Sequence, residues 1–237
     1  MGNNGINIII PLGDKIDLRF RIKPEPYTFE KAERLVAQLV NDIKSCARRY
    51  RGVTFTTIFF GGWGPSLLTL DQLYRILQAL YDSLTITPLE QTMLILPETI
   101  HHDKAKILRE SGFDQLTIRI NSSSIPKEDF MILRNAGFNS VGFEYQSPPN
   151  EQLSENLLHQ LFSLSPDHIY ILPQNPLTRS KLTHQGFHEF LPGHFCLPGK
   201  ENRHLQNLYT QHQKLVLSFG IDKKQNPEPW GLSYNSR

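Results

Sequence analysis

The side chains best suited to ligand chemistry gather late in the sequence. Four histidines fall within 21 residues, with one cysteine among them: His184, His188, His194, His204 and Cys196. Imidazole and thiolate are common donors to zinc and to haem iron. Their spacing matches none of the usual zinc templates. We therefore expect no metal site and mostly exposed loop histidines, with metal or haem ligation as the alternative.

A glycine-rich turn is the second candidate. Residues 57–68 read TIFFGGWGPSLL, so a β-branched and aromatic run ends in Gly61, Gly62, Trp63 and Gly64. Glycines at the end of a strand let the backbone approach a ligand closely. Trp63 sets a bulky indole into this turn. The residues leave open whether the indole stacks on a ligand or packs against the protein.

The elements that position these residues follow an alternating pattern. Six short apolar runs are expected to be strands: residues 6–10, 54–60, 92–96, 116–120, 140–145 and 168–172. Amphipathic segments with helical spacing lie between them, such as residues 28–50 and 69–84. This rhythm predicts βαβ units and a mainly parallel sheet, either doubly wound or an incomplete β/α barrel. In both, ligands bind at the carboxyl ends of the strands, where the glycine turn lies.

Two segments show the same order of features. Residues 107–121 and 132–146 both read as a helix end, then Gly-Phe, then a strand. Gly112 and Gly137 are expected to end their helices, and Phe113 and Phe138 are expected to start the next strands. The alternating pattern spans residues 1–175, which are expected to form the doubly wound sheet or the incomplete β/α barrel. An irregular extension with one more helical pattern, at 205–219, is expected over residues 176–220. Residues 221–237 form a polar tail.

Three stretches carry a family resemblance. Residues 57–77, 163–178 and 186–209 are similar, in order and spacing, to segments of the HemN/HemW branch of radical S-adenosylmethionine (radical SAM) proteins. That branch contains oxygen-independent coproporphyrinogen III oxidases and haem chaperones. The resemblance runs from about residue 6 to about residue 220 and implies an incomplete (β/α)6 barrel. It also implies that the family's C-terminal region is missing.

The resemblance locates the family's cluster motif, and this chain departs from it. Gly13, Asp17 and Phe20 stand where the family has three cysteines that bind a [4Fe–4S] cluster. Glycine and phenylalanine have no ligand atom, and aspartate is a hard donor poorly suited to such a cluster. We expect no cluster, no radical chemistry and no catalytic residues inherited from the family.

The methionine site of the family's cofactor is also altered. Gly61 and Gly62 are kept, but Trp63 replaces the third glycine of the family's turn and Gly64 replaces its threonine. We expect no S-adenosylmethionine binding. The indole is expected to fill the vacated cofactor space or to pack on a neighbouring helix, with stacking on another ligand as the alternative.

Other positions near the family's cofactor have changed as well. Leu94 and Leu96 replace a glutamate and an asparagine, and Gln115, Arg119 and Asn121 replace an arginine, a glycine and a glutamine; Glu144 stands at an aspartate. Glu98, Arg119, Glu144 and Gln146 can line the mouth of the barrel. For each of these four, we expect a solvated side chain rather than a catalytic one.

A haem site is implied by the resemblance alone. His204 matches a histidine that the chaperone branch is thought to use for haem. Arg203 can pair with a propionate, and Tyr209 can pack on a porphyrin edge. Leu205 replaces the asparagine that follows this histidine in the family. The implied haem site is therefore incomplete.

Composition limits the partners and the compartment. The chain has 237 residues, of which 39% are hydrophobic, and a net charge of +2. This charge gives no bulk attraction to nucleic acid or to a membrane. No apolar run approaches the ~20 residues of a membrane span, and the two cysteines, Cys46 and Cys196, cannot build a disulfide framework. We expect a cytoplasmic protein.

Three functional hypotheses follow. The first is a non-catalytic radical SAM homologue that acts as a binding or scaffold protein with an unknown protein partner. The second is a carrier of haem or another tetrapyrrole. The third is an enzyme with a new activity in a remodelled pocket at the strand ends.

Overall fold

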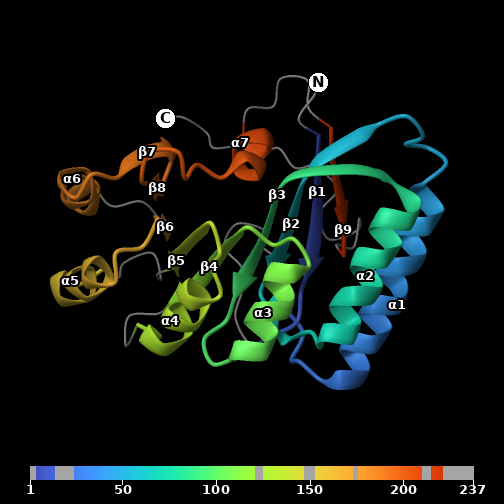
Figure 1. Ribbon diagram of the computed structural model, residues 1–237, viewed down its shortest axis with the longest axis horizontal. Coiled ribbons are helices and arrows are strands. Elements are labelled where there is room, and N and C mark those ends of the chain that lie inside the picture. The colour runs from blue at the N-terminus through green and yellow to red at the C-terminus, as the bar shows by residue number, and fades with distance from the viewer. Residues whose placement is uncertain are drawn as a thin grey trace. The chain divides into compact units, whose positions relative to one another are not determined.

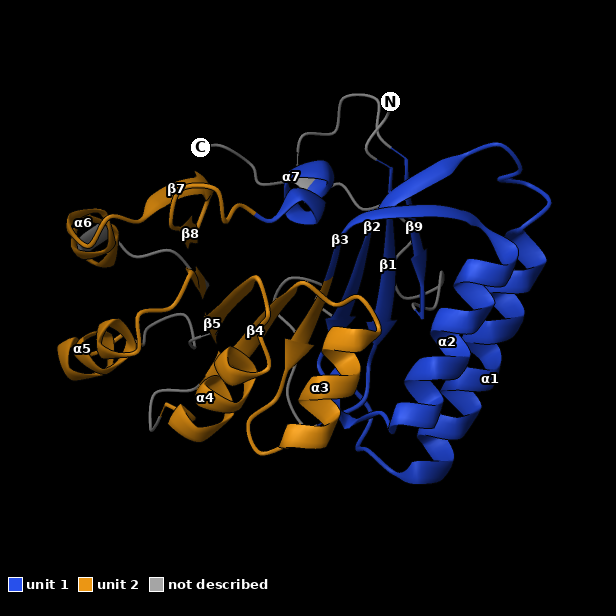
Figure 2. Ribbon diagram, in the orientation of Figure 1, with its two compact units in different colours: residues 1–91, 202–237 blue, residues 92–201 orange. Residues whose placement is uncertain are grey.

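The computed structural model describes residues 4–13, 24–120, 125–146, 153–172, 176–209 and 215–220. The chain forms two compact units (Figure 2). Unit 1 comprises residues 1–91 and 202–237, and unit 2 comprises residues 92–201. No helix within the described part is long and apolar enough to cross a membrane.

Unit 1 is built around the parallel strands β1 (Asn4–Ile10), β2 (Thr54–Gly62) and β9 (Val216–Phe219). β1 pairs with β2 on one side and with β9 on the other. β2 is buried from Phe55 to its end, because its continuous β-branched and aromatic run suits a strand covered on both faces.

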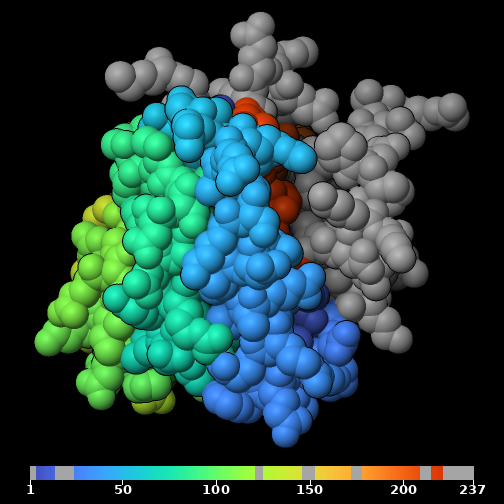
Figure 3. Space-filling view, turned by 90° about the vertical axis from the view of Figure 1, so that its right-hand side faces the viewer, coloured from blue at the N-terminus to red at the C-terminus, as the bar shows by residue number. Residues whose placement is uncertain are grey.

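Unit 1 also contains α1 (Phe29–Cys46), the short 3-10 helix η1 (Pro65–Leu67), α2 (Leu70–Ser83) and α7 (Arg203–Tyr209). Thr28 caps α1, and Thr69 forms a capping box with Gln72 at the start of α2. The long helices α1 and α2 lie side by side (Figures 1 and 3). α7 packs on β1 and β2.

Unit 2 contains a row of parallel strands, and two antiparallel strands extend this row. Residues 92–95 of β3 (Thr85–Ile95) pair with β4 (Gln115–Ile120), which pairs with β5 (Ser140–Gln146), which pairs with β6 (His168–Leu172). Antiparallel strands follow in the order β8 (His194–Cys196) and β7 (His188–Leu191). The helices are α3 (His102–Glu110), α4 (Lys127–Asn135), α5 (Glu155–Ser163) and α6 (Pro176–His184).

All six predicted strands are present. The pairs β1–β2, β3–β4, β4–β5 and β5–β6 among them are parallel. The mainly parallel α/β class is therefore confirmed. β7, β8 and β9 were not predicted. The range expected to be an irregular extension contains α6, β7 and β8. The predicted boundary at residue 175 stays a prediction.

Two local predictions were wrong. The pattern at residues 205–219 was expected to be one helix, but it holds the end of α7 and the strand β9. In β9, Leu217 and Phe219 are buried while Val216 and Ser218 are not, which is the period of a strand. Phe113 and Phe138 were expected to start strands. They are buried just before β4 and β5 begin, so they belong to the connections between helix and strand.

Candidate functional site

The glycine turn at the end of β2 contacts the chain's own backbone. A Cβ atom on Gly62 would lie 2.6 Å from the carbonyl oxygen of Ile10, and one on Gly64 would lie 2.2 Å from that of Leu12. Gly61 pairs with Ile9 in the ladder between β1 and β2. A side chain at Gly62 or Gly64 would clash with the backbone at the end of β1 or just after it, which is enough to explain why these positions are glycine.

The indole of Trp63 lies against Gly13. A Cβ atom on Gly13 would lie 1.8 Å from the indole Cδ1 and 2.7 Å from Nε1. Gly13 also has a φ of 145°, which side chains rarely adopt. The indole thus packs on the backbone that follows β1, and a side chain on residue 13 would meet the indole.

The loop that follows β1 is closed at its base. Gly13 N–H donates to the Glu25 carbonyl at 2.7 Å, and Glu25 N–H donates to the Pro11 carbonyl at 2.9 Å. Asp17 and Phe20 lie outside the described residues. Because two of the three positions carry residues without a ligand atom, and the third a hard carboxylate, this loop does not fit a [4Fe–4S] cluster.

A buried ion pair lies between β4 and β5 in unit 2. Arg119 and Glu144 are register partners, and the arginine Nε lies 2.9 Å from the carboxylate Oε1. Their side chains are 4% and 0% exposed. The prediction that both are solvated was wrong, because each supplies the other's counter-charge. Glu98 is exposed, as predicted, whereas Asn121 and the side chain of Gln146 lie outside the described part.

Neighbouring positions of unit 2 are also buried. Leu94, at the resemblance's glutamate position, is 1% exposed within β3. Gln115 begins β4 and is buried, where its amide donates to the Tyr170 hydroxyl at 3.2 Å. These two residues pack or pair within the protein.

His204 lies in the interior of unit 1. Its Nε2 is 2.5 Å from the amide oxygen of Asn7, and its Nδ1 is 2.8 Å from the hydroxyl of Thr57. An amide oxygen only accepts, so Nε2 carries the proton and Nδ1 accepts from Thr57. The ring stacks on Phe59 with 5.3 Å between centroids, and Gly5 leaves the space that the imidazole fills.

Helix α7 holds His204 in this place. Glu90 accepts hydrogen bonds from the backbone N–H groups of Arg203 at 2.8 Å and His204 at 3.0 Å. Asn202 caps the same helix by accepting from Leu205 N–H at 2.7 Å. Burial lowers the pKa of His204 from its usual 6.5 to about 3, so the imidazole is neutral at neutral pH.

His204 and Arg203, two of the three residues of the implied haem site, do not share a surface. His204 is fully buried, and both ring nitrogens are hydrogen-bonded. Arg203 is exposed, and the side chain of Tyr209 lies outside the described part. Haem ligation by His204 would require it to leave Asn7 and Thr57.

The late histidines divide into two groups. His184 is exposed and His188 is half-exposed, but His194 and His204 are fully buried. The prediction of exposed loop histidines was therefore wrong for two of the four. The reason is that residues 188–196 form the hairpin of β7 and β8 and residues 203–209 form α7, so both segments have an inner face.

A second buried histidine organises unit 2. His168 Nε2 lies 2.8 Å from the Thr117 hydroxyl, and its Nδ1 lies 2.9 Å from the Ser140 hydroxyl. Burial is the main cause that lowers its pKa to about 3, and the nearby positive charge of Arg134 adds to this. All three residues lie at or near the starts of their strands, away from the carboxyl ends where this fold class binds ligands.

Sequence reasoning missed the partners of these histidines. Asn7 is the one polar residue in the buried run INIII, and an isolated polar residue in such a run signals a buried partner. Thr57 and Glu90 carry no comparable signal, because threonine is common in strands and glutamate is usually exposed. Glu201, which lies beside His188 and Cys196, was missed because it lies outside the histidine spacing.

Comparison with known proteins bears on the fold alone. No family model matches the chain, and a search of curated proteins finds no match. Among solved structures, the chain is similar to coproporphyrinogen III oxidase (HemN) from Escherichia coli, a radical SAM enzyme, with a TM-score of 0.76 and 18% sequence identity. The match covers 93% of this chain and 64% of that enzyme. The chain therefore has a HemN-like radical SAM fold, and the predicted incomplete β/α barrel is confirmed.

Proposed function

We propose that this chain is a non-catalytic protein with a HemN-like fold, which binds neither a [4Fe–4S] cluster nor S-adenosylmethionine and acts as a binding or scaffold protein. The observation that carries the proposal is the contact between Trp63 and Gly13. A cysteine at position 13 would begin 1.8 Å from the indole. The residue that replaces a cofactor glycine thus occupies the space of a cluster ligand.

The chemistry of radical SAM enzymes depends on the cluster. The cluster supplies the electron that cleaves the cofactor's sulfonium, and it is held by cysteine thiolates. This chain has only two cysteines, Cys46 in α1 and Cys196 in β8. Neither belongs to the loop after β1, so the donor set of that loop supports no cluster.

The strand ends described above argue against a catalytic role. In unit 1, the backbone at the end of β1 and just after it fills the glycine turn. In unit 2, Arg119 and Glu144 neutralise each other in a buried pair. A catalytic acid or base must reach a substrate proton, and an interior ion pair is held away from one. This argument also weakens the hypothesis of a new enzyme at the same strand ends.

The haem hypothesis remains a separate prediction. It is tested by titrating haemin into the wild-type protein and into His204→Ala and His204→Gln, following the Soret band. Since His204 is buried between Asn7 and Thr57, we expect equal spectra and equal affinities. A Soret band lost only in the histidine variants would establish a carrier and overturn this part of the proposal.

The proposal itself is tested by calorimetry with S-adenosylmethionine. We expect no binding heat at millimolar ligand for the wild type or for Trp63→Gly. The variant restores the third glycine, but Ile10 and Leu12 still fill the turn. A cluster-containing radical SAM enzyme is the positive control. Saturable binding by the wild-type chain would contradict the proposal.

A further inference from the structure

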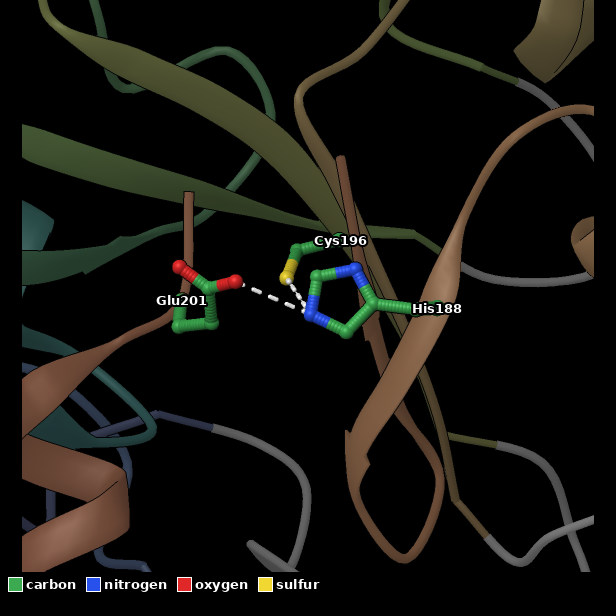
Figure 4. Close-up of side chains that lie close together, drawn as sticks. All are labelled: His188, Cys196 and Glu201. Atoms are coloured by element: carbon green, nitrogen blue, oxygen red, sulfur yellow. Dashed lines mark hydrogen bonds and ion pairs between the residues drawn. The ribbon is translucent and has the colours of Figure 1, made fainter. Parts of the chain in front are cut away.

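Three side chains with different donor atoms meet in unit 2, and none of them belongs to the ion pair of Arg119 and Glu144. His188 Nε2 lies 2.9 Å from Glu201 Oε1 and 3.7 Å from Cys196 Sγ (Figure 4). All three donor atoms lie within 4.8 Å of one another. One imidazole, one thiol and one carboxylate therefore converge on a single point.

The fold itself brings the three residues together. β7 and β8 form an antiparallel hairpin in which His188 and Cys196 are direct register partners. Direct partners project from the same face of a sheet. After β8 the chain turns, with Lys200 N–H donating to the Leu197 carbonyl at 3.0 Å, and this turn returns Glu201 to the hairpin. Sequence spacing alone does not show this meeting.

The distances suit a small tetrahedral ion. Usual zinc–ligand bond lengths place a nitrogen and a sulfur donor about 3.6 Å apart, and a nitrogen and an oxygen donor about 3.4 Å apart. The sulfur–nitrogen distance of 3.7 Å already matches the first value. The nitrogen–oxygen distance of 2.9 Å needs to widen slightly, which a glutamate on a turn permits by rotating its side chain.

The surroundings leave one side open. Cys196 is fully buried, whereas the side chains of His188 and Glu201 are 43% and 29% exposed. An ion can therefore enter from solvent while its thiolate ligand stays in the interior. Three protein ligands with one accessible position is the pattern of an open zinc site, in which water completes the tetrahedron.

We propose that His188, Cys196 and Glu201 form a binding site for Zn²⁺ or a closely similar divalent transition metal, with a water molecule as the fourth ligand. A thiolate and an imidazole select such ions over Mg²⁺ and Ca²⁺, which prefer oxygen donors. This site is independent of the proposed function, because none of its residues belongs to the β1–β2 turn or to the ion pair of Arg119.

The contrasting interpretation is an ordinary ion pair beside a buried thiol. His188 and Glu201 can satisfy each other without any metal, and Cys196 is then a small apolar residue of the hairpin. The two interpretations differ in one respect that can be measured. Only a metal site gives a sulfur-to-metal bond.

The test is a titration of the purified, reduced protein with Co²⁺, followed by displacement with Zn²⁺. We expect one Co²⁺ per chain, a thiolate-to-cobalt charge-transfer band and intense visible absorption that indicates tetrahedral geometry. Zn²⁺ should abolish both. Mg²⁺ at the same concentration should not displace Co²⁺.

Variants assign the site. Cys196→Ser should remove the charge-transfer band, and His188→Ala and Glu201→Gln should weaken Co²⁺ binding by about 100-fold or more, since even residues behind a ligand commonly contribute 10- to 100-fold. Cys46→Ser and His184→Ala are matched controls outside the cluster and should bind as the wild type does. Circular dichroism confirms that each variant is folded.

The outcomes separate the two interpretations. Loss of the band in Cys196→Ser but not in Cys46→Ser supports the site. The proposal is overturned if the wild type shows no thiolate band, or if Cys196→Ser, His188→Ala and Glu201→Gln all bind Co²⁺ as tightly as the controls do.

Discussion

Two strand ends of this molecule have been closed in different ways. At the end of β1 and β2 in unit 1, an indole and the chain's own backbone fill the space around the glycines. Between β4 and β5 in unit 2, a buried ion pair joins Arg119 to Glu144. The resemblance assigns both places to a cofactor, yet one now holds a packing contact and the other an electrostatic one.

The indole contact and the ion pair should respond differently when one of their side chains is removed. An apolar contact can lose atoms gradually, and its cost follows the cavity that remains. A buried ion pair instead loses its full stabilisation at once, since removing one member leaves an uncompensated charge in the interior. The ion pair of Arg119 and Glu144 should therefore be more sensitive to a single substitution than the contact between Trp63 and Gly13.

The largest expected effect is the loss of one member of the ion pair. Arg119→Met should lower the free energy of unfolding by about 3–5 kcal/mol, because Glu144 would stay buried without its counter-charge. The measurement is urea denaturation followed by circular dichroism. The double variant Arg119→Met/Glu144→Leu is the control and should recover much of the loss. If it is as unstable as the sum of the two single variants, the pair is not the cause.

A smaller effect is expected at the indole. Trp63→Gly should cost about 2–3 kcal/mol, less than a fully buried tryptophan, since this side chain is partly exposed. Gly13→Ala should also destabilise the protein, and its cost should fall by about 0.5–3 kcal/mol in the Trp63→Gly background. Strictly additive costs in this double-mutant cycle would show that the two residues do not compete for one space.

Each unit also holds a buried histidine with a lowered pKa, which predicts a response to acid. His204 in unit 1 and His168 in unit 2 have pKa values lowered from 6.5 to about 3. The unfolded chain binds protons below pH 6.5 and the folded chain does not. Stability is therefore full above about pH 6.5 and falls toward pH 3, by about 1.4 kcal/mol per pH unit for each histidine.

This prediction is checked by measuring unfolding free energies between pH 7 and pH 4. His204→Gln and His168→Gln should each remove about half of the pH dependence that these two histidines cause. Both variants should also lower the free energy of unfolding at pH 7. The exposed His184→Gln is the control. An unchanged slope in both buried variants would show that other groups cause the acid response.

The smallest effect is expected at an exposed pair. Lys106 and Glu110 lie 3.9 Å apart on α3, with side chains 75% and 63% exposed. Lys106→Ala should change the free energy of unfolding by less than about 0.5 kcal/mol, because solvent screens such pairs. This variant sets the baseline for Arg119→Met within the same unit. A cost similar to that of Arg119→Met would remove the distinction between buried and exposed pairs.

The sequence predicted the elements better than their contacts. The six strands were readable because runs such as INIII and TFTTIFF have one physical interpretation, a strand buried on both faces. β9 was missed because helical spacing and strand alternation overlap in a short apolar run. β7 and β8 were missed because they are only 4 and 3 residues long.

Side-chain environments were predicted less well. Arg119 and Glu144 were expected in solvent, since charged residues are rarely buried without a partner and the sequence does not show which residues are in register. His204 was identified as special only through the resemblance. Its burial depends on Asn7 and Thr57, which lie more than 140 positions away along the chain.

The most direct test of the central claim is anaerobic reconstitution with iron and sulfide, followed by analysis of bound iron, acid-labile sulfide and the absorption spectrum. The account predicts no stoichiometric iron or sulfide after desalting, because Gly13 and Phe20 have no ligand atom and Trp63 lies against Gly13. About four irons and four sulfides per chain, with the visible absorption of a [4Fe–4S] cluster, would contradict it.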